Sequence, residues 1–193
     1  MRLLIFAGFA VAGLAITAPV SLDEFHVRSP AGHEHLHDPR INWTYYHVEG
    51  TEHRDIIRSI NQNSPGRYWG RAIWRLSWAD EPCSKDDIDI HLEVILPRHR
   101  EFWRLSPALK ASWEMMYDAL IMHEVNHIEH GLSALADLVD AECEGGEAIV
   151  HYWTMQDILY DRRTNHGLSE GVRLRDPSKI ERAWARAEEA EED

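Results

Sequence analysis

The sequence has few cysteines and few basic side chains. Its two cysteines, Cys83 and Cys143, have no cysteine or histidine at zinc-finger spacing beside them, which disfavours a zinc site built from thiolates. Lys and Arg number 20 against 33 Asp and Glu. The formal net charge of -13 argues against nucleic acid as a partner, because a phosphate backbone selects clustered Lys and Arg.

The overall composition excludes two further classes of protein. Hydrophobic residues make up 44% of the chain and charged residues 27%, close to the averages for globular proteins. Disorder throughout the chain and a multi-span membrane protein are therefore disfavoured. The residue in excess is histidine, present 13 times, which is the commonest metal ligand among side chains.

The N-terminus predicts export. Residues 3–20 form an apolar run behind Arg2, the layout of a secretory signal, and 18 apolar residues are also just enough for an uncleaved membrane anchor. We therefore expect a secreted or periplasmic protein that meets a membrane only through residues 1–20. In such an oxidising compartment the one available disulfide, Cys83 with Cys143, would stabilise the fold by about 4 kcal/mol.

The remaining chain divides into three parts. Residues 21–40 are rich in histidine, proline and glycine and read as a linker, and its alternating His33, His35 and His37 offer at most a weak metal site. Residues 41–176 carry the sequence patterns of a folded domain. Residues 177–193 predict an acidic C-terminal helix or tail.

The apolar patterns predict an α+β domain. Strands are expected over residues 41–48, 71–78 and 89–96, and a short helix over 51–61. Ser106 and Pro107 predict the start of a long helix that reaches residue 143 unless Gly131 ends it earlier, and a further helix should cover 147–159, followed by a loop over 160–176. We expect a small antiparallel sheet packed against the long helix and one or two further helices.

The long helix contains the motif HEVNH at residues 123–127. Residues four apart lie on one face of a helix, so His123 and His127 can bind one metal ion. Glu124 lies one position further round, where its carboxylate can take a proton from water that the metal activates. The motif predicts a zinc-dependent hydrolase.

A catalytic zinc needs a third protein ligand. His130 follows on the same helix, but seven residues place it about 10 Å along the axis from His123, too far to share a tetrahedral ion. Glu147 and His151 from the next helix and His166 from the predicted loop remain as alternatives.

The chain resembles a family of bacterial proteins described as predicted secreted zinc-dependent proteases. The resemblance covers residues 43–172 and rests on YHVEG at 46–50, on HEVNH at 123–127 and above all on YDRRTNHG at 160–167, although Asn126 stands where similar sequences carry Gly. It implies zinc held by His123, His127 and His166, Glu124 as the general base, and Tyr160 as a donor to the oxyanion. Asp161 and Thr164 would order the loop or hold an imidazole.

These observations predict a secreted zinc metallopeptidase that acts on a peptide or another amide. The alternative is a non-catalytic periplasmic protein that binds metal through the same histidines. A passive metal site has no need for Glu124, so this carboxylate separates the two hypotheses.

Overall fold

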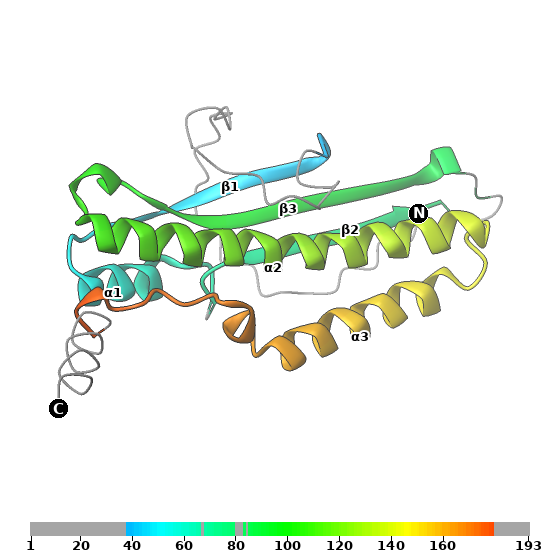
Figure 1. The fold of residues 1–193 in the computed structure, drawn as a ribbon. Coiled ribbons are helices and arrows are strands. Elements are labelled where there is room, and N and C mark those ends of the chain that lie inside the picture. The colour runs from blue at the N-terminus through cyan, green and yellow to red at the C-terminus, as the bar shows by residue number, and fades with distance from the viewer. Residues whose placement is uncertain (1–37, 67, 80–82, 84, 180–193) are drawn as a thin grey trace.

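The computed structural model describes residues 38–66, 68–79, 83 and 85–179. The predicted signal or anchor, most of the histidine-rich linker with His33, His35 and His37, and nearly all of the predicted C-terminal helix lie outside these residues. The described part is an α+β fold, as predicted, in which a sheet packs against the long helix α2 (Figure 1).

The sheet has three strands in the order β1-β3-β2. β1 spans Ile41–Val48, β2 spans Arg71–Trp78, and β3 spans Ile88–His99. The first two ranges match the prediction, whereas β3 extends beyond the predicted 89–96 at both ends. The prediction of a purely antiparallel sheet is wrong, because β3 pairs antiparallel with β2 and parallel with β1. Helix α1 (His53–Asn63) connects β1 to β2, and β3 lies between these two strands in the sheet.

Helix α2 (Pro107–Asp140) runs along the sheet without a break (Figure 1). Its N-terminus is capped as predicted, since the Ser106 side chain accepts a hydrogen bond from the Leu109 N–H. Gly131 does not end the helix. A Cβ at this position would lie 2.6 Å from the Trp74 side chain, so the glycine allows α2 to pack closely on β2.

Helix α3 (Gly146–Thr164) turns back beneath α2 (Figure 1). The helix was predicted to end at residue 159, and the prediction of a loop from Tyr160 is wrong for residues 160–164. This last stretch lacks an apolar period because Tyr160 and Asp161 face polar side chains of α2 instead of the core. The helix ends at Thr164, and the next residue, Asn165, adopts left-handed backbone angles with φ of 50°.

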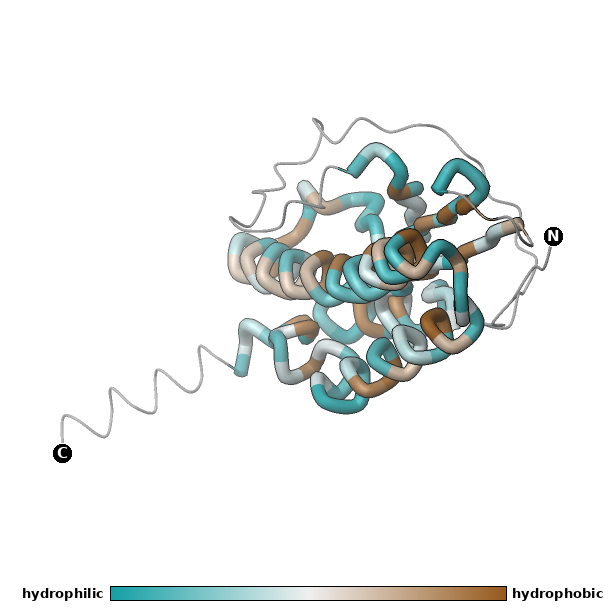
Figure 2. The backbone as a smooth tube through the Cα atoms, turned by 90° about the vertical axis from the view of Figure 1, so that its right-hand side faces the viewer, coloured by the Kyte–Doolittle hydropathy of each residue, from teal (hydrophilic) through white to brown (hydrophobic). Residues whose placement is uncertain are grey.

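Two apolar clusters hold these elements together. The larger lies between the sheet, α1 and α2, and the smaller joins β2, α2 and α3 around Trp78, Leu138 and Val150. Hydrophobic and hydrophilic residues are interspersed along the chain (Figure 2). On α1 the buried Ile56 and Ile60 mark the face that packs on the core.

Cys83 and Cys143 form a disulfide, as predicted, with Cα atoms 6.0 Å apart. It ties the connection after β2 to the turn between α2 and α3, and it is consistent with an extracytoplasmic protein. None of the helices among the described residues combines the length and the apolar character that crossing a membrane requires.

The contact between Gly131 and Trp74 predicts that replacing this helical glycine by alanine destabilises the protein, although alanine usually stabilises a helix. Gly131→Ala should lower the free energy of unfolding by about 1–3 kcal/mol, because the added methyl group overpacks the interface. Helix propensity alone would favour alanine by about 1 kcal/mol. Urea unfolding would measure the change. In a Trp74→Gly background, which also removes the Trp74 Cβ 2.6 Å from the added methyl group, the same substitution should be neutral or stabilising. An equal loss in both backgrounds would contradict the packing explanation.

Candidate metal centre

A cavity of about 920 Å³ opens beside the middle of α2. It is bordered by α1, by the residues leading into β2, by the C-terminal end of α3 and by the chain that follows α3. His123, Glu124 and His127 all line it, although each is buried, with 4%, 4% and 7% of its surface exposed. Three residues of the HEVNH motif therefore lie at the wall of this cavity.

The two motif histidines point toward the same place. Their Nε2 atoms lie 3.3 Å apart, and the planes of the two rings are nearly perpendicular. This is the convergence that four-residue spacing on a helix predicts.

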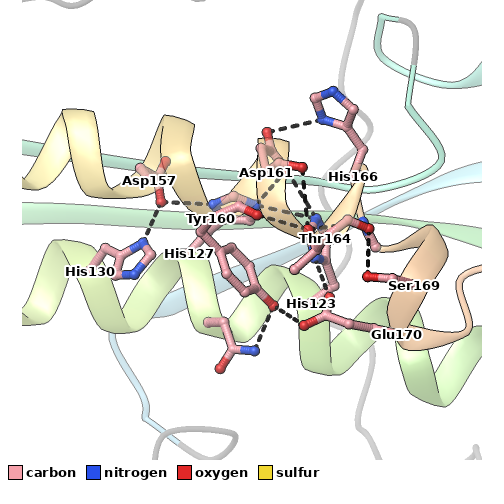
Figure 3. A network of polar contacts seen from close by, with 12 residues as sticks. His123, His127, His130, Asp157, Tyr160, Asp161, Thr164, His166, Ser169 and Glu170 are labelled. Atoms are coloured by element: carbon pink, nitrogen blue, oxygen red, sulfur yellow. Dashed lines mark hydrogen bonds and ion pairs between the residues drawn. The ribbon is translucent and has the colours of Figure 1, made fainter.

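Asp161 of α3 supplies a third donor atom at this place. Its Oδ1 lies 3.2 Å from His123 Nε2 and 3.3 Å from His127 Nε2 (Figure 3). These three side chains form a buried His/His/Asp group that could hold a metal ion.

The outer nitrogen of each histidine meets another carboxylate. His123 Nδ1 lies 2.8 Å from Oε2 of Glu170, which belongs to a short 3-10 turn (Leu168–Glu170), and His127 Nδ1 lies 2.7 Å from Oδ1 of Asp157 on α3. Histidines that bind a metal almost always donate their second N–H in this way, which orients the ring. The contacts leave both Nε2 atoms directed at Asp161.

The carboxylates change the proton affinities of the group. Burial lowers the pKa of His127, but hydrogen bonds to Asp157 and Asp161 outweigh it and raise this pKa to about 10. Burial raises the pKa of Asp161, but hydrogen bonds from His123 and His127 hold it well below its usual range. In the metal-free protein, the imidazoles therefore keep protons that a metal would displace.

Glu124 is positioned by a glycine and by a backbone N–H. A Cβ on Gly70 would meet Oε1 of Glu124, so the carboxylate occupies the space that any other residue would fill there. The carboxylate also accepts a hydrogen bond from the backbone of Ala72 at the edge of the sheet. Burial raises the pKa of Glu124 to about 7, with His127 and His123 opposing the shift.

His166 lies next to Asp161 but outside the His/His/Asp group. Its Nδ1 is 3.2 Å from Asp161 Oδ2, an ion-pair distance, but the direction of approach is not that of a hydrogen bond, and this buried nitrogen has no hydrogen-bond partner. The ring stacks on Tyr68 with centroids 4.1 Å apart. The predicted role of His166 as the third ligand stays a prediction.

The hydroxyl of Tyr160 is occupied by two polar contacts. It donates to Oε1 of Glu170 at 2.7 Å and accepts from Nδ2 of Asn126 at 2.7 Å (Figure 3). Tyr160 does not line the cavity. Its predicted contact with an oxyanion stays a prediction, while the contacts made here fix the carboxylate that holds His123.

The other candidates have different surroundings. His130 Nδ1 lies 2.8 Å from Asp157 Oδ1, which makes a second group of His127, His130 and Asp157. Glu147 and His151 are exposed on α3 and belong to neither group. Thr164 donates to the Tyr160 carbonyl and accepts from the Gly167 N–H, so it orders the end of α3 and the turn that follows.

Sequence reasoning missed Asp157, Glu170 and Gly70 and assigned Asp161 only a supporting role. Asp157 and Asp161 are four residues apart, which places two carboxylates on one helix face once the helix is extended past residue 159. No sequence signal marks Glu170, which reaches His123 only because the chain folds back after α3.

The raised pKa of His127 predicts proton release on zinc binding. At about pH 8 an ordinary histidine is already neutral, but His127 should still carry the proton that zinc displaces. Calorimetry in two buffers with different ionisation enthalpies should show that binding releases about one proton or more at this pH. Release close to zero would contradict the proton distribution described here.

Comparison with known proteins identifies a family without an assigned activity. No curated protein and no solved structure matches the chain. Residues 43–167, which include most of β1, HEVNH and the histidine of YDRRTNHG, match a described family. The chain belongs to the bacterial protein family of unknown function DUF922.

Proposed function

We propose that this chain is a zinc-dependent metallopeptidase in which His123, His127 and Asp161 hold the zinc and Glu124 is the general base. The peptide or other amide that it cleaves would occupy the cavity beside α2. The proposal replaces His166 by Asp161 as the third ligand and keeps the other ligands predicted from the sequence.

The spacing of the three donor atoms carries the proposal. They are 3.2, 3.3 and 3.3 Å apart. Around a tetrahedral zinc with bonds of about 2.0 Å, any two ligand atoms lie about 3.3 Å apart. Two imidazole nitrogens and one carboxylate oxygen are also a donor set that zinc accepts, with one position left for water or substrate.

The surroundings of the histidines support the same ligand set. Glu170 and Asp157 each hold the outer nitrogen of one imidazole, which fixes both the ring orientation and the tautomer that leaves Nε2 for a metal. A pair of histidines that served only to stabilise the fold would need no third donor at an equal distance from both.

Glu124 supports catalysis rather than metal storage. A bound zinc lowers the pKa of water and polarises a carbonyl group. In hydrolysis, water adds to the carbonyl carbon and the C–N bond breaks. Glu124 would take a proton from this water and pass it to the leaving amine. Its carboxylate lines the cavity, and the Ala72 backbone holds it beside the ligands.

The ligand assignment predicts different effects for Asp161 and His166. Asp161→Asn should weaken zinc binding by about 100-fold or more, because it removes a charged ligand. His166→Asn should change the affinity by less than about 10-fold. Competition with a chromogenic chelator would measure both, with the exposed Asp140→Asn on α2 as the matched control. The reverse order of the two effects would identify His166 as the ligand.

The mechanism predicts that Glu124→Gln abolishes hydrolysis and leaves zinc in place. Peptide cleavage should fall by about 100- to 10,000-fold, because the amide cannot accept the proton. Elemental analysis should still find one zinc per chain. The matched control is Glu114→Gln, an exposed position on the same helix.

Two outcomes of that experiment would contradict the proposal. Unchanged cleavage by the Glu124→Gln protein would refute Glu124 as the base. Tight zinc binding by the natural sequence with no cleavage of unfolded proteins or peptides would favour the alternative, a non-catalytic metal-binding protein.

A further inference from the structure

One wall of the cavity is apolar and continues directly into the protein core. Ile57 of α1, Leu120 of α2, and Val172 and Leu174 of the chain after α3 all line the cavity. Leu120, Val172 and Leu174 are members of the larger core cluster, and Ile57 packs against it. These four side chains, the apolar wall, are where the core opens toward the metal centre.

Two glycines show how closely the apolar wall approaches the reacting groups. A Cβ on Gly70 would meet both the Cδ1 of Leu120, at 2.8 Å, and the carboxylate of Glu124. A Cβ on Gly167 would meet both the Val172 side chain and the ring of His123, the latter at 3.1 Å. Leu120 therefore lies beside the proposed base, and Val172 lies beside a proposed ligand.

Polar contacts on both sides hold the wall in place. His53 Nε2 lies 3.1 Å from the Leu174 carbonyl oxygen, which attaches this segment to α1. The Ser112 hydroxyl donates to the Arg175 carbonyl at 2.9 Å and accepts from the Arg175 N–H at 2.7 Å, which attaches it to α2. The apolar surface is thus formed before any substrate arrives.

We propose that the apolar wall is a subsite for a large apolar side chain of the substrate, adjacent to the amide bond that is cleaved. This inference rests on the proposed function and adds the substrate class: peptides with a leucine-like or phenylalanine-like residue next to that bond. An apolar side chain leaves water when it covers Ile57, which is only partly buried, whereas a small or charged side chain gains nothing there.

The cavity also contains charged residues, which would favour a different substrate preference. Apart from the side chains of the metal centre, the charged residues that line it are Arg71 and Arg173. If they determined specificity, acidic residues would be preferred next to the cleaved bond. The two preferences are distinguished by the same experiment.

Cleavage of an unfolded protein by the zinc-loaded full chain tests the proposal. Reduced casein can serve as the substrate, with mass spectrometry of the products to identify the residues that flank each cleaved bond. Synthetic peptides that differ only at the preferred flanking position then give rates. Leu or Phe there should be cleaved about 10- to 100-fold faster than Ser or Asp. No preference, or a preference for acidic residues, would overturn the proposal.

Variants of the wall should change this preference. Ile57→Ala should reduce the ratio of Leu to Ser cleavage rates by about 3- to 10-fold, because part of the apolar contact is lost. Ile158→Ala is the matched control, since this isoleucine lies on α3, is 40% exposed and does not line the cavity. An unchanged ratio in Ile57→Ala would contradict the role of the wall.

A binding measurement separates failure of the subsite from failure of the proposed function. Hydroxamates of leucine and of glycine bind zinc through the same group and differ only in the side chain. Calorimetry on the zinc-loaded protein should show the leucine compound binding about 10-fold more tightly or better. This result without any peptide cleavage would retain the subsite and refute the peptidase. Equal affinities would refute the subsite even if peptides are cleaved.

Discussion

The candidate metal centre depends on the pairing of two buried imidazoles with carboxylates from other parts of the chain. His123 and His127 are buried on α2, and an isolated charged or polar group in such a place is costly. Asp161 lies close to both inner nitrogens, while Asp157 and Glu170 meet the outer ones. The same contacts dock α3 and the following turn on α2. The polar contacts of the site therefore also stabilise the packing of α3 on α2.

Glycines set the distances that this arrangement requires. Gly131 lets α2 approach Trp74 of β2, and Gly146 lets the start of α3 pack against Trp78 and Leu138. Gly70 leaves space for the Glu124 carboxylate at the edge of the sheet. A side chain at any of these positions would meet a neighbour at less than 3 Å. The close packing of the long helix on the sheet and the position of Glu124 at the cavity therefore depend on glycines, which have no side chain of their own.

Much of the fold follows from local patterns. The strands 41–48 and 71–78 were predicted with their observed bounds, and Ser106 caps the long helix as its sequence position suggests. The parallel pairing of β1 with β3 was missed, because the direction of a strand pair depends on connections that a pattern does not reveal. The end of α3 was missed for another reason. Its last turn faces the metal centre, where carboxylates replace the apolar residues that mark a buried helix face.

By itself the sequence determined the α+β class, the one available disulfide and the face of α2 that carries two histidines and a carboxylate. These properties depend on residue spacing within one element or on a count of two cysteines. Only the tertiary structure decided which groups surround the histidines. Asp161, and not His166, lies close to both His123 and His127. Glu170 contacts His123 although the two residues are 47 positions apart in the sequence. Metal donor sets depend on distances of a few ångströms between separate elements, and packing alone determines those distances.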